Sequence, residues 1–284
     1  MIIVRFIGGL GNQMFQYAFY RRLKEQYKLV KADITGFKKY TLHNGYELER
    51  VFNIKADFAT IDEIESVMEL YKKNILDRLK RKVFGIRKTH ITESRYKEDY
   101  LKKGNLYLDG YWQGEKYFIT CEKIVRNDFQ FRSDLSDKNR AMISNIATTN
   151  SISVHVRRGD YLNLPMYFKC DSNYYKRAVD IIKERATNPY YFIFSDDISW
   201  VKCNIDFGKQ AFYVDYNNSA SSFEDMRLMS FCKHNIIANS SFSWWGAWLN
   251  QNTNKIVIAP KIWFNDEKKN SETKDLIPDG WIRL

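Results

Sequence analysis

The second half of the chain alternates between short apolar segments and amphipathic ones, and this pattern narrows the possible folds. Segments of strand length lie at 151–157, 190–194, 210–214, 235–238 and 255–259. Segments with helical spacing lie between them, near 173–186, 222–232 and 242–250. Strands that alternate with helices build parallel sheets whose two faces are both covered. The pattern therefore predicts an α/β fold with an open parallel sheet.

The first half begins with a unit of the same kind. Residues 2–7 are typical of a strand, Gly8–Gly11 of a tight turn, and the apolar spacing from Met14 to Leu23 predicts a helix. Apolar positions from Ile61 to Val83 predict a long amphipathic helix, whereas residues 84–125 indicate loops and short strands.

Length and polarity together predict two domains. A chain of 284 residues is long enough for two domains of ordinary size. The polar segment 136–150 is a plausible link between them. We therefore expect a first domain at 1–148 and a second at 149–284.

The cysteines and the amino terminus indicate the compartment. Cys121, Cys170, Cys203 and Cys232 form no CxxC pair and have no nearby histidine to complete a zinc set, so we expect buried free thiols in a reducing environment. Met1 leads directly into a strand, and no window is long and apolar enough for a membrane span. These features predict a soluble, cytoplasmic protein.

The formal net charge of +11 favours an anionic partner, which could be a nucleic acid, a nucleotide diphosphate or an acidic membrane surface. The basic residues are dispersed along the chain, and no nucleic-acid-binding motif is present. A nucleic-acid-binding protein is therefore the weaker alternative.

Polar groups follow four of the predicted strands. They lie at 155–160, 195–197, Asp215 and 239–241. Ligands of open parallel sheets bind beyond the carboxyl ends of the strands. Four such ends in one sheet predict a binding site there.

Arg157 is the strongest single candidate within that site. Its planar guanidinium remains charged and offers paired donors that suit a diphosphate. The competing interpretation is an ion pair with Asp160. The polar groups at the neighbouring strand ends favour the diphosphate.

Two further positions have competing interpretations. Ser240 and Ser241 precede a helix whose first N–H groups would favour a phosphate, but a serine there could simply cap the helix. Asp225 could accept the paired N–H donors of guanine, or it could close a capping box with Ser222. The sequence leaves both choices open.

A metal site is the less favoured interpretation of Asp196 and Asp197. Adjacent side chains diverge in an extended chain, and Arg157 can itself neutralise a leaving group. The turn before the first helix is no dinucleotide fingerprint, because Met14 occupies the position of the third glycine. The turn could still bring its backbone and Asn12 close to a ligand.

Four segments in order resemble the motifs of bacterial α1,2-fucosyltransferases. They are 8–18 (GGLGNQMFQYA), 155–161 (HVRRGDY), 194–197 (FSDD) and 239–246 (NSSFSWWG). The resemblance does not cover the middle of the chain, about 30–120, or the residues after 246. It implies a GT-B-like arrangement of two Rossmann-like domains facing a cleft. The first would be the acceptor side and the second would bind a GDP-sugar.

The resemblance also implies residue roles. Transfer would proceed from GDP-β-L-fucose with inversion and without a required metal, to a hydroxyl that the family suggests is O2 of galactose in a surface polysaccharide or O-antigen. By similarity, Arg157 would hold the β-phosphate, and Asp225 would read the guanine. The other implied donor-site residues are Asn12, His155, Asp197, Ser240 and Ser241.

Charge development suggests a further role for Asp160. Fixed donors aimed at the phosphates stabilise the negative charge that develops on GDP as the sugar leaves. The acceptor hydroxyl must lose a proton, and Asp160 is the candidate base. It could instead orient Arg157 or Arg158, and the sequence does not choose between these roles.

Two expectations concern partners. The acceptor could be lipid-linked, but the basic residues at 72–82 favour a solvated helix face over contact with an anionic membrane. A carbohydrate-binding protein without catalysis is the third functional alternative, and it would need no arginine placed for a phosphate.

Overall fold

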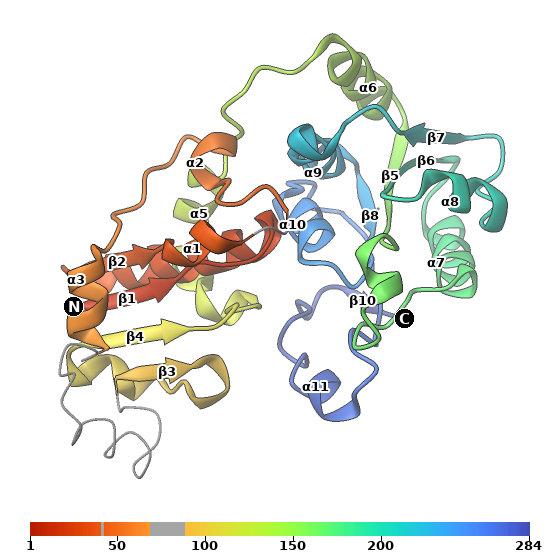
Figure 1. The fold of residues 1–284 in the computed structure, drawn as a ribbon. Coiled ribbons are helices and arrows are strands. Elements are labelled where there is room, and N and C mark those ends of the chain that lie inside the picture. Colours follow the sequence, from red (N-terminus) through yellow and green to blue (C-terminus); the bar gives the residue numbers. More distant parts are fainter. Residues whose placement is uncertain (41–42, 69–88) are drawn as a thin grey trace. The chain divides into compact units, whose positions relative to one another are not determined.

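The computed structural model describes residues 1–40, 43–68 and 89–284 (Figure 1). The chain divides into two compact units, Met1–Arg132 and Ser133–Leu284. This division lies before the expected boundary at 148, and it assigns the polar segment 136–150 to the second unit. The segment is a helix, α6 (Asp137–Thr148), and not a link. Its Ile146 is buried against Phe192 and Phe194 in the core of the second unit.

The first unit contains a parallel four-stranded sheet in the order β2-β1-β4-β3. Its strands are β1 (Ile2–Arg5), β2 (Val30–Asp33), β3 (His90–Thr92) and β4 (Leu106–Asp109). Its helices are α1 (Leu10–Gln26), α2 (Leu48–Val51), α3 (Ile61–Val67) and α5 (Glu122–Asp128). In the register of the central strand, Ile2 pairs with Val30 on one side and with Leu106 on the other.

Helix α3 is the described part of the long helix predicted at 61–83. A capping box starts it: the Thr60 hydroxyl accepts from the Glu63 N–H, and the Glu63 side chain accepts from the Thr60 N–H. Ile64 and Val67 pack against Ile3 and Tyr107 on one face of the sheet. The predicted continuation, including the basic face at 72–82, lies outside the described residues.

The second unit contains a parallel six-stranded sheet in the order β10-β9-β8-β5-β6-β7. Its strands are β5 (Asn150–Val156), β6 (Pro189–Ser195), β7 (Ala211–Val214), β8 (His234–Ile236), β9 (Val257–Ala259) and β10 (Ile282–Arg283). Besides α6, its helices are α7 (Ser172–Arg185), α8 (Ile198–Asn204), α9 (Phe223–Phe231), α10 (Ser241–Leu249) and α11 (Glu267–Ser271). The five strands predicted in this half are confirmed, whereas β10, α8 and α11 were not predicted.

Helices cover both faces of this second sheet, as the alternation predicted. Residues 152, 154 and 156 of β5 share a buried cluster with side chains of α7 and α8. Phe192 and Phe194 of β6 point to the other face, where they join residues of α6 and α9. Figure 1 shows α7 and α8 on the side of the sheet away from α9 and α10.

The strand order creates a switch point beside β5. The chain moves from β5 outward through β6 to β7, and then returns to place β8 on the other side of β5. In sheets of this kind, ligands bind beyond the carboxyl ends of the strands where the order reverses. The carboxyl end of β5 is therefore where a ligand is expected, and Arg157 follows it directly.

Two expectations about the whole chain can be compared with the structure. Cys121, Cys170 and Cys232 are buried free thiols, but Cys203 is exposed at the end of α8, so the expectation that all four are buried was wrong. Among the described residues, no helix has both the length and the apolar character that crossing a membrane requires.

Candidate functional site

Arg157 is held at the end of β5 by two carboxylates. Its Nη2 lies 2.6 Å from Asp160 Oδ1, and its Nη1 lies 2.9 Å from Asp196 Oδ2. Its guanidinium lies 5.5 Å from the centre of the Tyr161 ring. The side chain remains 26% exposed, so part of the guanidinium can still reach a ligand. The predicted ion pair with Asp160 is present, and it fixes the arginine without burying it.

The turn after Arg157 depends on a close approach between Gly159 and Asp196. A Cβ atom at Gly159 would lie 2.5 Å from Asp196 Oδ2, which is closer than side chains pack. The other oxygen of Asp196 accepts the backbone N–H of Arg158 at 2.9 Å. The end of β6 therefore fixes the course of the chain as it leaves β5.

Arg158 forms a second fixed cation beside the first. Its guanidinium carbon lies 3.6 Å from the centre of the Trp200 ring, and its Nε lies 3.4 Å from Asp197 Oδ2. Asp197 also caps α8 by accepting the N–H of Trp200 at 3.0 Å. Trp200 was not identified from the sequence as a partner of Arg158. Its position three residues after Asp197 could have indicated this role.

The oxygens of Asp196 and Asp197 all accept from protein groups. Asp196 accepts from Arg157 and from the Arg158 N–H, whereas Asp197 accepts from the Trp200 N–H and from the Arg158 side chain. Binding a metal here would require breaking these contacts. Elsewhere in the described ranges, histidine, cysteine and acidic side chains do not gather in threes in a way that could hold a metal ion.

Helix α10 begins at the same edge of the sheet. Ser240 caps it, because its Oγ accepts the N–H of Phe242 at 3.3 Å. The capping interpretation of Ser240 is thus confirmed, and a capping hydroxyl can still donate its proton to a ligand. Ser241, the first residue of the helix, is only half-buried. The tryptophans that follow at 244, 245 and 248 are buried in the core.

His155 joins the end of β5 to the start of α10. Its ring centroid lies 5.8 Å from that of Phe242, and the side chain is buried. Burial, with a smaller contribution from the charge of Arg157, lowers the pKa of His155 to about 3, so the ring is neutral near pH 7. Its Nδ1 has no hydrogen-bond partner within the described residues. Buried polar atoms are normally paired, so this nitrogen is suited to meet a ligand.

Asp225 lies in the first turn of α9. Helix α9 follows β7, so its amino end is also on the carboxyl side of the sheet. The Ser222 side chain does not cap this helix, which removes the capping-box interpretation of Asp225. Asp225 Oδ1 instead accepts from Asn217 Nδ2 at 2.7 Å. Burial raises the pKa of Asp225 to about 7, despite the hydrogen bond from Asn217, which lowers it.

Asn12 belongs to the first unit, near the start of α1. Its Oδ1 accepts from Gln113 Nε2 at 2.8 Å, which ties the turn after β1 to the loop after β4. Gly8 in that turn has a φ of +93°, a conformation that favours glycine.

The structure thus brings some of the predicted residues into direct contact and not others. Arg157, Arg158, Asp160 and Asp197 form one network, which Asp196 completes. His155 and Ser240 both adjoin Phe242, one through ring packing and one through a hydrogen bond. Asp225 and Asn12 have their own partners, Asn217 and Gln113.

Known proteins resemble this chain along its whole length. The model of a family described as glycosyl transferase family 11 matches residues 1–284. An α-1,2-colitosyltransferase from Escherichia coli is 35% identical over 291 residues, which cover 100% of this chain and 99% of that protein. The O-antigen biosynthesis glycosyltransferase WbnK from Escherichia coli is 32% identical over 305 residues, covering 98% of each chain.

A solved structure resembles the fold. The fucosyltransferase NodZ from Bradyrhizobium superposes with a TM-score of 0.51 at 15% sequence identity, covering 87% of this chain and 91% of that one. This likeness supports the mixed α/β fold with parallel sheets. Since the family model spans the whole sequence, the chain belongs to glycosyl transferase family 11.

Proposed function

We propose that this chain transfers L-fucose from GDP-β-L-fucose to O2 of a galactose in an acceptor glycan, with inversion to an α linkage. The acceptor would be part of an O-antigen or a similar surface polysaccharide. Family membership supports glycosyl transfer. The α1,2 linkage and the O-antigen role follow from the names of the two Escherichia coli relatives, and the choice of fucose and galactose follows from the sequence motifs.

The observation that carries the proposal is the pair of guanidinium groups at the switch point. Arg157 and Arg158 follow β5 directly, and both are fixed by carboxylates of the 195–197 segment. Negative charge develops on the diphosphate as the sugar–phosphate bond breaks. Cations that are already oriented stabilise that charge without having to reorganise. We assign the β-phosphate to Arg157.

The remaining donor contacts are assigned by chemistry. The Ser240 and Ser241 hydroxyls and the first N–H groups of α10 would bind the phosphates. Asp225 would accept the two N–H donors on the edge of guanine, and the unpaired Nδ1 of His155 would face the nucleotide. Asp197 would keep Arg158 in place, and Asn12 would border the donor sugar.

We propose that no metal is required. Arg157 and Arg158 supply the positive charge that a metal would bring, and the oxygens of Asp196 and Asp197 are already engaged. If these aspartates bound a metal, they would have to release both arginines. The arginines would then no longer be oriented to bind the diphosphate.

The identity of the donor sugar is the most specific part of the proposal. Fucose and colitose differ by one hydroxyl group, and a pocket built for that hydroxyl would reject the sugar lacking it. The test is to incubate the protein with GDP-fucose or GDP-colitose and a panel of methyl glycosides, and to determine the product linkage by NMR. We expect an α1,2-fucosyl galactoside. Transfer of colitose alone would reassign the donor, and transfer of neither sugar would overturn the proposal.

Arg157→Ala tests the proposed role of the guanidinium pair at the switch point. We expect this variant to lose most GDP binding in a thermal-shift titration and transfer activity by about 100-fold or more, the usual cost of removing a transition-state donor. Arg177→Ala on the exposed side of α7 is the matched control and should behave like the wild type. Stabilisation of the wild type by oligonucleotides and not by GDP would favour the nucleic-acid alternative.

A further inference from the structure

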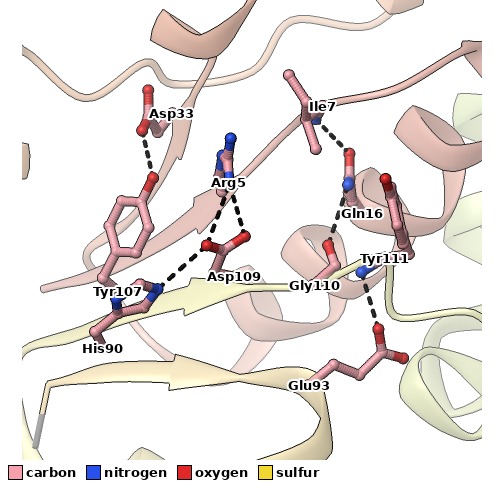
Figure 2. Close-up of polar contacts among 10 residues, drawn as sticks. All are labelled: Arg5, Ile7, Gln16, Asp33, His90, Glu93, Tyr107, Asp109, Gly110 and Tyr111. Carbon is pink, nitrogen blue, oxygen red and sulfur yellow. Dashed lines mark hydrogen bonds and ion pairs between the residues drawn. The ribbon is translucent and has the colours of Figure 1, made fainter. Parts of the chain in front are cut away.

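A second group of polar side chains lies at the carboxyl ends of the strands in the first unit. Figure 2 shows Arg5, Asp33 and Asp109, which end β1, β2 and β4. None of them belongs to a sequence motif, and none has a role in the donor site described above. They meet only because the strands are parallel and in register.

The Asp109 carboxylate is oriented from two sides. Arg5 Nη1 lies 3.1 Å from Oδ1 and 3.2 Å from Oδ2, and His90 Nε2 lies 3.2 Å from Oδ2 (Figure 2). The side chain of Asp109 remains 25% exposed. Asp33, by contrast, is buried and accepts from the Tyr107 hydroxyl and the Thr35 N–H. Asp109 is therefore the carboxylate of this group that a ligand can reach.

The loop after Asp109 is fixed at several points. Glu93 Oε2 accepts the N–H groups of Tyr111 and Trp112, both at 2.9 Å. Gln16 accepts the N–H of Ile7 at 2.9 Å and donates to the Gly110 carbonyl at 3.1 Å, so it joins the loops that follow β1 and β4 (Figure 2).

This anchoring is costly. Glu93 is half-buried, and burial raises its pKa, so its charged form is disfavoured under the loop. Trp112 has a φ of +54°, which is rare for a bulky residue, while its ring is buried 4.5 Å from that of Phe19. At Gly110, a Cβ atom would lie 2.6 Å from that of Glu93. Strain of this kind concentrates at functional sites.

The anchored loop displays one aromatic ring. Tyr111 is 46% exposed, although both of its neighbours are fixed and Trp112 is fully buried. The ring is thus exposed two residues after a reachable carboxylate, on a loop whose backbone is held by Glu93 and Gln16.

The charges of this edge select an uncharged ligand. The edge proposed to bind phosphates in the second unit has two neighbouring guanidiniums, Arg157 and Arg158. Here Arg5 supplies a single guanidinium, and its Nη1 is engaged by both oxygens of Asp109. A diphosphate would therefore find only one cation at these three strand ends, already paired. A pyranose has an apolar face of C–H groups that packs on an aromatic ring, and hydroxyls that donate to carboxylates.

We propose that the carboxyl edge of the first-unit sheet is the subsite for the acceptor sugar, with Tyr111 packing against the sugar ring and Asp109 accepting hydrogen bonds from its hydroxyls. This inference rests on the proposed glycosyl transfer and adds the residues that select the acceptor. Arg5 and His90 are positioning residues, since they act through Asp109.

Two variants test the subsite. Tyr111→Ala should raise the KM for the best methyl glycoside by about tenfold, as truncation of an interface aromatic typically does, and Tyr111→Phe should keep most of the affinity. Asp109→Asn should also raise this KM. Ile119→Ala, which removes a similarly exposed side chain in the same unit, is the control and should change nothing. The KM for GDP-fucose and the hydrolysis of GDP-fucose without acceptor should stay at the wild-type level.

Saturation-transfer NMR separates this inference from the proposed function. Methyl glycosides of galactose, glucose and N-acetylglucosamine serve as probes without any nucleotide. We expect one of them to bind the wild type and Arg157→Ala, but not Tyr111→Ala. Unchanged binding by Tyr111→Ala, or binding of none of the probes, would overturn the subsite. Failure of GDP to bind the wild type would overturn the proposed function and leave this result standing.

Discussion

At the scale of single residues, Asp160 has two proposed roles, base and orienter of Arg157. Its Oδ1 lies 2.6 Å from Arg157, but Asp196 holds the same guanidinium through its other nitrogen. Asp160→Asn should therefore lower kcat by about 100-fold, the usual contribution of a general base, with little loss of GDP affinity. Steady-state kinetics and calorimetry measure the two effects. Asp180→Asn on the exposed face of α7 is the control. Equal losses of turnover and affinity would leave Asp160 only the orienting role.

If Asp225 reads the guanine as proposed, donor affinity should depend on pH. With a pKa of about 7, it is partly protonated in the free protein near neutrality. The N–H donors of guanine favour its ionised form, so affinity should rise from pH 6 to pH 8, by up to about tenfold per unit below the pKa. Calorimetry with GDP-fucose measures this, since its esterified β-phosphate does not titrate in that range.

Asp225→Asn provides the control for this dependence. The variant should bind more weakly and nearly independently of pH, and a wild-type affinity that does not change with pH would remove Asp225 from the guanine site. In the free protein, the folded pKa lies above the unfolded value of 3.8. The native state therefore binds more protons between about pH 4 and pH 7, and the free energy of unfolding falls as the pH rises through this window. The asparagine variant should lack that fall.

The sequence could indicate the residues of the proposed donor site because they belong to short motifs, but it could not indicate those of the proposed acceptor subsite. Arg157, Asp160 and Asp197 lie in segments whose residue types alone suggest phosphate chemistry. Glu93 and Tyr111 are far apart in sequence from Arg5, and no local pattern distinguishes them. Their positions are set by the register of the strands and by the hydrogen bonds that Glu93 accepts from backbone N–H groups.

At the scale of elements, strong periodicity decided what could be predicted. Strand β5 alternates strictly and was predicted within a residue at each end. Helix α6 was mistaken for a link because, of its twelve residues, only Asn139 and Ile146 are buried, so its apolar stripe is weak. Strand β10 has two residues, too few to show any period, and its place beside β9 arises from tertiary pairing.

The turn between β5 and the 195–197 segment gives a prediction at this scale. In Gly159→Ala, the new Cβ would lie 2.5 Å from Asp196 Oδ2, so Asp196 must move away from the arginines that it holds. We expect GDP affinity to fall by about tenfold or more, with a loss of unfolding free energy of about 1–2 kcal/mol. Titration calorimetry and thermal unfolding check both.

Gly280→Ala is the matched control, because no atom lies within 4 Å of its added Cβ. It should change neither affinity nor stability. If Gly159→Ala bound GDP like the wild type, the arginines would not depend on the position of Asp196.

At the scale of the whole molecule, the two sheets carry different charged groups at their strand ends. The net charge of +11 could not say where an anion binds. The structure places two neighbouring guanidiniums at one strand end of the second unit, where Asp196 and Asp197 hold them, and a single guanidinium, paired with Asp109, at the strand ends of the first. The alternation of strands and helices predicted parallel sheets, but not which strands are neighbours. The order of the strands determines which side chains meet at both proposed sites.

The same distribution leads to the expectation that transfer does not depend on a metal. Activity should stay within about twofold of its value when EDTA is added if, as proposed, the arginines supply the charge that stabilises the leaving diphosphate. Asp196→Asn distinguishes the two roles of the acidic pair. If Asp196 orients Arg157 and Arg158, the variant loses GDP affinity equally with and without Mg²⁺. If Asp196 is a metal ligand, the loss appears only when Mg²⁺ is present, and EDTA alone would stop the wild type.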